Sequence, residues 1–468
     1  MKVSRFIVIA LVALLVMQGL AISAFAAPPA GTWITGIQVQ NVSTTQDAHI
    51  TVTFYWAAGT AQAGQVAHSF TDTIPMGKAL AYYVPNIAGV PANFVGSVVV
   101  SSDVEVAAVL NTSKVSTGVG TDAKRVGTAV GVMDPSNTVY APLLRKNFYQ
   151  YNSYIAVQNT ANTTTTVVVN YTDSAGTAIP AAKETVDVPP FSTKIFYQND
   201  NTNLPDGFWG SAIITGTQPL ATVVNVAAAG SSIASAGFES YNGFGSGVTK
   251  LYLPKLTVNY YGYQGGFTIQ NTGNAAATMT ITYHYGANVY TKQSPLIQPG
   301  QAWGVFLATS VNSGLPVGTS GVGSGVVESL QPMVAIVSER NDTYGFDFAS
   351  QGVPDGSGTT TALFPKFDSR FYDYDGGIAI QNLGTTSTTL RATFSMQGHT
   401  DVVVDSPEIG PGGSYPWYGP NVVPALGSGF VGSVVVVSLN SQPIAGVYTS
   451  RNVVLTGDSA GAYNGIQK

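Results

Sequence analysis

The sequence predicts an all-β protein built from tandem β-sandwich domains. A strand motif ending in Gln-Asn occurs four times, at Asn41, Asn159, Asn271 and Asn382, with spacings of 118, 112 and 111 residues. These spacings suit one small domain per repeat and are too long for a solenoid coil. Short alternating apolar segments separated by turn residues fill each repeat, and no helical period occurs after residue 26.

The N-terminus has the pattern of a secretory signal peptide. Lys2 and Arg5 precede an apolar run from Phe6 to Met17, and small residues lead to Ala26. We expect cleavage after Ala26 and a secreted protein of the extracellular space or cell surface. No later apolar run reaches the roughly 18 residues of a spanning helix, so we expect no membrane span after signal cleavage.

Composition narrows the possible partners. The chain has no cysteine, so each repeat must be held by its own hydrophobic core. Without Lys2 and Arg5 there are 17 basic and 24 acidic residues, a net charge of −7. This balance offers no basic face and therefore predicts no nucleic-acid binding. Only 9% of the residues are charged and 52 are glycine, which favours strands over helices.

Each repeat follows a common order of segments. An aromatic-Pro strand, as at Tyr252 and Pro254, precedes the Gln-Asn strand and a second alternating strand. A Pro/Gly corner, an aromatic strand and a Gly-Ser block with a Val/Ile run follow, and the run reads as a central strand. We expect a signal peptide at 1–26 and sandwich repeats at 27–137, 138–249, 250–361 and 362–468.

This order resembles the immunoglobulin-like repeats of secreted bacterial surface and adhesion proteins. The resemblance covers the whole chain after the signal peptide and implies four tandem Ig-like β-sandwich domains with an extracellular structural or adhesive role. It supplies no catalytic residue. We also expect the four repeats to form a rod or gently bent chain. The Gly/Ser/Thr-rich stretches 113–138, 228–249 and 342–361 are expected linkers, either flexible or packed.

Two sets of residues recur at equivalent positions. The four Asn residues that end the Gln-Asn strands fall on the inner face, where we expect them to bind loop backbone and so to be structural. Aromatic residues precede the same strands and are candidates for binding a sugar or a neighbouring molecule, or for contacts between domains. They are Trp33, Tyr149, Tyr151, Tyr261, Tyr263, Tyr372 and Tyr374.

No catalytic or metal-binding pattern emerges. Asp368, Asp373 and Asp375 hold only part of a calcium loop, so a polar turn is the favoured interpretation. The four histidines lie at unrelated repeat positions. We therefore expect no cofactor, no metal and no enzyme, although a pair of carboxylates assembled across strands stays open as a hydrolase site.

Repeat one lacks the opening aromatic-Pro strand. This gap could accept a strand from another chain and propagate head-to-tail assembly, or the short N-terminal segment could fill it. Three hypotheses follow. In the first, the chain is a secreted structural protein of the cell surface or matrix that can assemble with itself into a filament or surface layer. In the second, it is a carbohydrate-binding or adhesive module for surface glycans. The third is the hydrolase.

Overall fold

The computed structural model describes residues 7–13, 31–43, 45–116, 118, 123–230, 236–396, 398–422, 424–455 and 457–467. The predicted signal peptide lies outside these residues except for Ile7–Ala13, which form a strand. Every repeat consists of two packed antiparallel sheets with equivalent strand order. The fold is therefore all-β, as predicted. Among the described residues, no helix has the length and apolar character that crossing a membrane requires.

Repeat one pairs its strands in the orders β1-β6-β3-β4 and β5-β2-β7-β8. Its elements are β1 (Ile7–Ala13), β2 (Trp33–Asn41), β3 (Ala48–Trp56), β4 (Val66–Ile74), β5 (Ala79–Tyr83), η1 (Val84–Asn86), β6 (Gly96–Ser102), β7 (Val106–Lys114) and β8 (Arg125–Val130).

Repeats two and three each use one 21-residue strand in both sheets. Repeat two contains β9 (Ser136–Lys146), β10 (Tyr151–Asn159), β11 (Thr165–Asp173), η3 (Pro180–Ala182), β12 (Glu184–Val188), β13 (Thr193–Tyr197), β14 (Phe208–Ala228) and β15 (Phe238–Asn242). Repeat three contains β16 (Val248–Val258), β17 (Gln264–Asn271), β18 (Met279–Tyr285), β19 (Asn288–Gln293), β20 (Ala302–Phe306), α1 (Ser310–Ser313), β21 (Gly321–Asn341), β22 (Phe346–Gln351) and β23 (Val353–Pro354).

Repeat four returns to separate strands, in the orders β27-β26-β29-β24-β32 and β28-β25-β30-β31. Its elements are β24 (Thr361–Ser369), β25 (Tyr374–Asn382), β26 (Leu390–Ser395), β27 (Val402–Asp405), β28 (Ser414–Tyr418), α2 (Gly419–Val422), η5 (Pro424–Leu426), β29 (Phe430–Ser438), β30 (Ile444–Asn452), β31 (Gly461–Asn464) and β32 (Ile466–Gln467).

The alternation of apolar residues explains why each sandwich forms. Ile50, Val52 and Phe54 of β3 point inward and are at most 1% exposed, whereas the intervening threonines are partly exposed. A strand with one apolar face must cover that face with a second sheet. Among the described residues, each repeat accordingly contains its own large apolar core.

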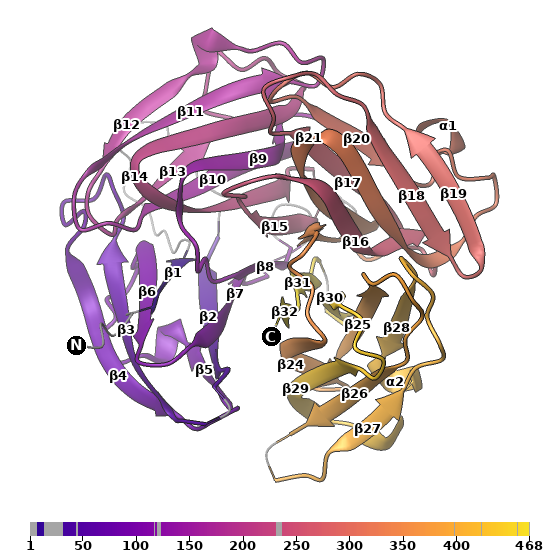
Figure 1. Ribbon diagram of the computed structural model, residues 1–468. Helices are drawn as coiled ribbons and strands as arrows, with labels where there is room; N and C mark the ends of the chain where they lie inside the picture. Colours follow the sequence, from indigo (N-terminus) through magenta and orange to yellow (C-terminus); the bar gives the residue numbers. More distant parts are fainter. Residues whose placement is uncertain are drawn as a thin grey trace, which may run out of the picture.

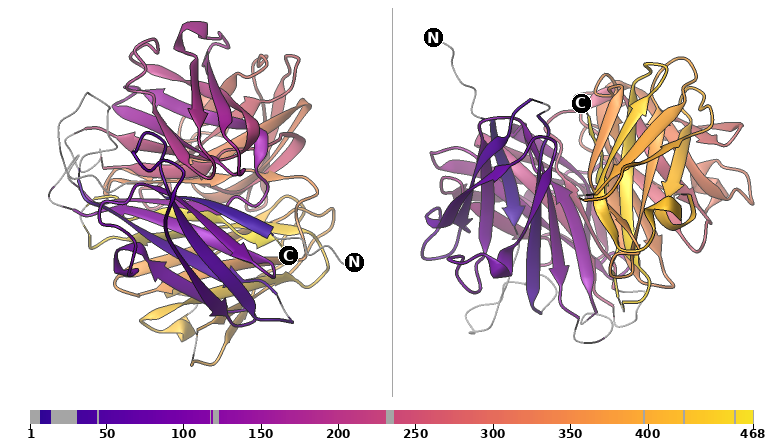
Figure 2. Two further views of the ribbon diagram at one scale, coloured as in Figure 1. Left: turned by 90° about the vertical axis from the view of Figure 1, so that its left-hand side faces the viewer. Right: turned by 90° about the horizontal axis from the view of Figure 1, so that it is seen from below.

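The four repeats close into a ring, so the expected rod is wrong (Figure 1). The last strand of the second sheet in each repeat lies at the centre, where β8 packs on β15, β15 on β22, β22 on β31, and β31 on β8. We call these four strands the hub. Repeats one and four lie side by side (Figure 2, right), and Gln38 Nε2 donates to the Pro365 carbonyl oxygen at 3.0 Å.

The stretches expected to be linkers contain three of the hub strands. Their glycines allow close packing, since a Cβ atom at Gly237 would overlap the Asp347 carboxylate and one at Gly127 would overlap Ser240. The small residues of these stretches therefore let strands pack closely at the centre of the ring. They do not form flexible connections between the repeats.

Amide side chains join the hub strands at one end. Asn242 exchanges two hydrogen bonds with the backbone of Val130, at 2.7 and 3.2 Å, and Asn464 does the same with Gln351, at 2.7 and 2.8 Å. Gln351 Nε2 in turn donates to the Asn242 carbonyl oxygen at 2.9 Å. Repeats one to four are thus linked through backbone groups that water cannot reach easily.

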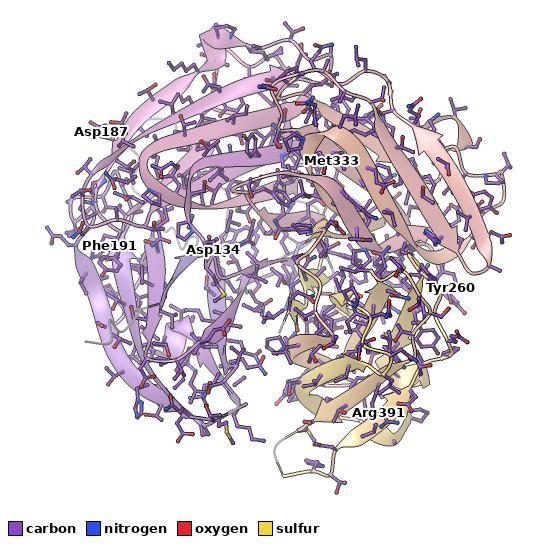
Figure 3. The ribbon with its side chains drawn as sticks, in the orientation of Figure 1. Asp134, Asp187, Phe191, Tyr260, Met333 and Arg391 are labelled. Atoms are coloured by element: carbon purple, nitrogen blue, oxygen red, sulfur yellow. The ribbon has the colours of Figure 1, made fainter. Side chains whose placement is uncertain are left out.

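A second set of hydrogen bonds joins repeats further from the centre. The serine of the Gly-Ser block donates to a carbonyl at the Pro/Gly corner of the next repeat, and the glutamine of that repeat's Gln-Asn motif donates to the same oxygen. These acceptors are Phe191 (from Ser97 and Gln158), Gly300 (from Ser211 and Gln270) and Gly412 (from Ser324 and Gln381), at 2.6 to 3.2 Å. Figure 3 labels Phe191 at the first of these joints.

The joint between repeats four and one differs. Ser433, at the equivalent of Ser211, is half-buried instead of buried, and no hydrogen bond links it to a described residue of the repeat-one corner at Gly77. This joint is held at the hub, by a bridge between Lys124 and Gly457, and by a small apolar cluster of Val42, Ala107 and Leu363.

The hydrogen bonds from the serines of the Gly-Ser blocks can be tested with a matched pair of variants. Ser211→Ala removes a buried hydrogen bond, while Gln270 still satisfies the Gly300 oxygen, so we expect the free energy of unfolding to fall by about 1 kcal/mol. Ser433→Ala should change it by less than about 0.5 kcal/mol. Denaturant titration of both variants measures the difference; equal losses would contradict this account of the joints.

Candidate functional site: tyrosine turns and the cleft between repeats two and three

Four of the predicted aromatic residues lie between neighbouring repeats. They stand at or next to the first residue of β2, β10, β17 and β25, which places them beside the hub. Each contacts the following repeat in the ring. The Trp33 and Phe238 ring centroids are 5.2 Å apart, and the Tyr151 hydroxyl donates to Asp347 Oδ2 at 2.5 Å. The Arg451 guanidinium lies 5.2 Å from the Tyr263 ring centroid, and Lys124 Nζ lies 6.0 Å from that of Tyr374.

The other three predicted aromatics project into solvent. Tyr149, Tyr261 and Tyr372 are 82%, 81% and 80% exposed. Each packs edge-on against the aromatic residue before it, with ring centroids 4.6 to 4.7 Å apart. Because these tyrosines precede equivalent strands, the ring carries them on the same face. We call the three segments, residues 148–151, 260–263 and 371–374, the tyrosine turns.

The backbone of these turns does not itself favour tyrosine. Tyr149 and Gln150 have φ angles of 48° and 64° and connect Phe148 and Tyr151 in a two-residue hairpin. Such a turn prefers Asn-Gly, because a side chain with a Cβ atom costs about 1 kcal/mol or more in this left-handed conformation. Tyr261 and Tyr372 repeat the geometry, with φ angles of 49° and 45°. An exposed, strained tyrosine present three times suggests a role at the surface.

A cleft of about 800 Å³ lies between repeats two and three, with Tyr149 among its lining residues. This volume is in the range of small-molecule sites. Its aromatic and charged lining residues are Phe148, Tyr149, Tyr151, Trp209, Phe267, Phe306, Arg145, Glu239, Glu339, Arg340, Asp342 and Asp347. The Arg145 guanidinium lies 4.8 Å from the Tyr151 ring centroid, and that of Arg340 lies 5.4 Å from the Phe306 centroid.

The acidic groups at the inner end of the cleft are buried. Glu239 and Glu339 are each 3% exposed, and Glu339 accepts hydrogen bonds from Lys255. Burial, with the nearby Glu239 carboxylate, raises the pKa of Asp347 to about 7. Burial also raises the pKa of Glu239, and the Arg145 guanidinium opposes that shift.

The buried Asp458 carboxylate ties three repeats together at the hub. Its Oδ2 accepts the backbone N–H of Phe238 at 2.7 Å and that of Asp347 at 3.0 Å. Burial and the neighbouring Asp347 raise the pKa of Asp458 well above its ordinary value. Arg125, also buried, donates to the Gly237 carbonyl oxygen at 3.2 Å.

The four motif asparagines all bind loop backbone and are wholly buried. Asn271, for example, donates to the carbonyl oxygens of Ala275 and Ile297 at 2.9 Å and accepts the N–H of Gly273. Asn41, Asn159 and Asn382 make the equivalent contacts. Each one holds a turn against the Pro/Gly corner.

The three aspartates of the partial calcium pattern do not converge. Asp368 is buried and accepts hydrogen bonds from Tyr448 and Ser450, while Asp375 accepts the Arg370 N–H. In the part of the chain that the structure describes, no three His, Cys, Asp or Glu side chains gather as metal ligands.

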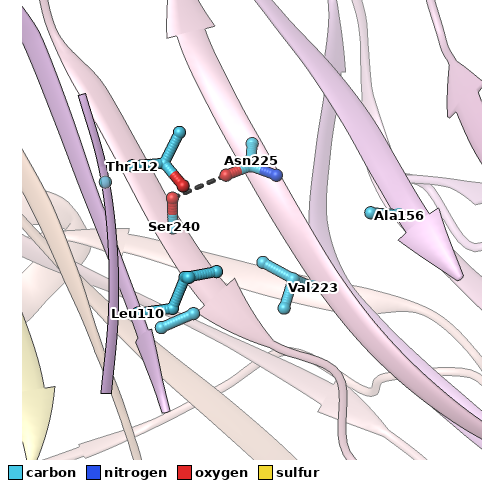
Figure 4. Close-up of a pocket in the computed structure, with 8 residues that line it drawn as sticks. Leu110, Thr112, Ala156, Val223, Asn225 and Ser240 are labelled. Atoms are coloured by element: carbon cyan, nitrogen blue, oxygen red, sulfur yellow. Dashed lines mark hydrogen bonds between the residues drawn. The ribbon is translucent and has the colours of Figure 1, made fainter. Parts of the chain in front are cut away.

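A smaller cavity between repeats one and two has a volume of about 10 Å³ (Figure 4). At its wall, Ser240 donates to Asn225 Oδ1 at 2.6 Å. This space holds at most one water molecule. It is therefore a packing defect at a joint and not a binding site.

The residues that connect the repeats were not predicted from the sequence. The glutamine of the Gln-Asn motif and the serine of the Gly-Ser block both recur in the sequence, and that recurrence was a usable signal. Their partners were not visible because the carbonyl groups they bind belong to a different repeat. Trp209, which lies on the cleft wall, recurs in no other repeat and had no such signal.

No protein-family model and no curated protein matches this chain. Among solved structures, Thermotoga maritima 1070 is 20% identical, with a TM-score of 0.20, and the match covers 23% of this chain and 96% of that one. A tetra-tandem repeat in the extending region of a large adhesion protein is 14% identical, with a TM-score of 0.11, 93% of this chain and 94% of that one being covered.

The pilus adhesin SpaC from Lactobacillus rhamnosus GG is 11% identical, with a TM-score of 0.10 over 91% of this chain and 50% of that chain. At these TM-scores none of the three similarities fixes the family of this chain.

The buried acids predict an unusual pH dependence of stability. Asp347 has a pKa of about 7 in the folded protein and 3.8 ordinarily, so the folded state retains a proton that the unfolded chain loses. The contribution of Asp347 to the free energy of unfolding is thus greatest below about pH 4, and it falls as the pH rises to about 7. We expect the free energy of unfolding of the wild-type protein to fall by about 2.5 kcal/mol between pH 5 and pH 8 through Asp347.

Asp347→Asn should flatten that part of the profile, because an amide does not titrate and still accepts a hydrogen bond from Tyr151. Asp187→Asn, at an exposed position on β12 (Figure 3), serves as the control. Urea midpoints from pH 5 to pH 8 measure the effect. A profile unchanged by Asp347→Asn would show that Asp347 is not the titrating group.

Proposed function

We propose that the chain is a secreted, non-enzymatic protein of the cell surface or extracellular matrix, in which the four repeats form one rigid ring that presents the tyrosine turns to a partner. The observation that carries this proposal is the strained and 80% or more exposed tyrosine in three equivalent turns. Tyrosine offers a flat apolar face and a polar hydroxyl, a combination common at the centre of protein interfaces.

The arrangement of the buried polar groups supports a structural role. Glu339 is paired with Lys255, Asp347 with Tyr151, and Asp458 with two backbone N–H groups. The contacts of Asp347 and Asp458 connect different repeats, whereas Glu339 and Lys255 stabilise repeat three from within.

Self-association is part of this proposal, but its form differs from a head-to-tail rod. Because repeats one and four contact each other within one chain, a rod end is not available for propagation. Contacts between rings through their tyrosine faces would bury several exposed aromatics at once.

The tyrosine turns can be tested without disturbing the fold. The triple variant Tyr149→Asn, Tyr261→Asn, Tyr372→Asn should keep or raise Tm, because asparagine tolerates the left-handed conformation better. The same variant should lose self-association, measured by light scattering across a concentration series with negative-stain images. A wild-type protein that stays monomeric at every concentration would remove self-association from the proposal.

The second candidate function is carbohydrate binding in the cleft between repeats two and three. The specific observation that favours it is the proximity of Trp209 to the Phe148 ring, 6.4 Å away, with Tyr149 at the same cleft. Adjacent aromatic faces can stack on sugar rings, and Arg145 and Arg340 could donate to hydroxyl groups.

A glycan array followed by titration with any selected oligosaccharide tests this second function. Trp209→Ala should lower the affinity at least tenfold, a loss of about 1.4 kcal/mol. Tyr261→Ala, at an equally exposed tyrosine that does not line this cleft, should leave affinity unchanged. A loss of affinity in Tyr261→Ala but not in Trp209→Ala would place the glycan on the tyrosine face and would contradict binding in the cleft.

A further inference from the structure

Strand β1 occupies a position that the secreted protein cannot fill by itself. Residues Ile7–Ala13 pair antiparallel with β6 over seven residues, with Leu11 opposite Val98 and Ile9 opposite Val100. In repeats two to four the strands β9, β16 and β24 take the same place in the sheet. In those repeats, however, the strand comes from the segment directly before the Gln-Asn strand.

Cleavage of the predicted signal peptide removes this strand. Residues 7–13 belong to its apolar run, and a cut after Ala26 discards them. The repeat spacing of 118 residues maps Ser136–Lys146 of β9 onto residues 18–28, of which only residues 27 and 28 survive cleavage. Six residues remain before β2 begins at Trp33, too few to cross to the other sheet and pair along β6.

An empty position beside β6 would uncover both backbone and core. Val98 and Val100 are 0% exposed and belong to the same apolar core as Ile50 and Phe54. Without a neighbour, one edge of β6 would also expose a row of unpaired N–H and C=O groups. Such an edge readily accepts another strand.

We propose that β6 of the mature protein accepts an antiparallel apolar strand from a different polypeptide chain. A second copy of this chain has no strand to spare, because in the described residues the apolar strands are paired within their own repeats. The donor is therefore a partner protein with an extended segment of about seven residues. Main-chain hydrogen bonds would supply affinity, and apolar side chains opposite Val98 and Val100 would supply specificity.

The repeat arrangement limits the stoichiometry. Repeats two, three and four contain their own first strands, so among the described sheets only that of repeat one lacks one after cleavage. Each ring therefore takes one donor strand. The strand that would accept the donor is also joined to the rest of the ring, because Ser97 of β6 donates to the Phe191 carbonyl oxygen of repeat two at 2.6 Å.

This inference rests on export with cleavage after Ala26, as proposed above, and is independent of the tyrosine turns. Mass spectrometry of the exported protein provides the first check. A mature chain that retains residues 7–13 can pair its own strand with β6. That result would overturn the inference and leave the proposed function of the tyrosine turns intact.

The binding test uses the exported mature protein and a synthetic peptide of residues 6–13 extended by lysines for solubility. We expect saturable 1:1 binding and a higher Tm. We also expect the peptide to slow hydrogen exchange at the amides of Gly96–Ser102 by about tenfold or more. A control peptide with Asp in place of Ile9 and Leu11 should do none of these, because it would place carboxylates beside Val98 and Val100.

The mature protein could be too unstable to assay without a donor strand. A second variant therefore carries the sequence of residues 7–13 at its N-terminus, joined through a flexible linker. It should be more stable than the mature form and should not bind the peptide. Amides of β6 that are already protected in the monomeric mature protein, or a stable dimer protecting the same amides, would overturn the proposed donor.

Discussion

The closure of the ring at the hub is the constraint on which the rest of the structure depends. Four short strands, one from each repeat, meet at the centre, and each must approach two others closely. Glycine at Gly127 and Gly237 permits the approach, and Asn242, Gln351 and Asn464 satisfy the backbone groups that the approach buries. Opening any one joint would expose these groups, so the repeats act as one body.

This constraint also explains where charge is buried. Asp347 and Asp458 are fixed at the hub by hydrogen bonds from Tyr151 and from backbone N–H groups, and burial raises the pKa of both carboxyl groups. Burying acids is unfavourable unless they are paired or neutral. The geometry of the hub therefore makes its stability sensitive to pH, while the tyrosine turns stay exposed at the surface.

The sequence was sufficient to predict the all-β class and the position of each strand motif, because apolar alternation and turn residues are local signals. It also led to the inward asparagines, whose partners lie only a few residues away or at the corner of the same repeat. The ring was not predictable in the same way. Its contacts, such as those of Gln38 with Pro365 and Phe238 with Asp458, join residues more than 200 positions apart and have no local pattern. The Gly/Ser/Thr-rich stretches were expected to be linkers, either flexible or packed, and all three contain packed hub strands. Composition alone could not decide between these alternatives, because glycine permits close packing as readily as flexibility.

Small-angle X-ray scattering of the monomeric mature protein tests ring closure most directly. Four domains of about 110 residues closed into a ring have a radius of gyration of about 25 Å, whereas the same domains in a line have one of about 40 Å. Ring closure predicts a value near 25 Å that stays constant in moderate salt. A value near 40 Å would show that repeats one and four do not meet and would contradict the hub.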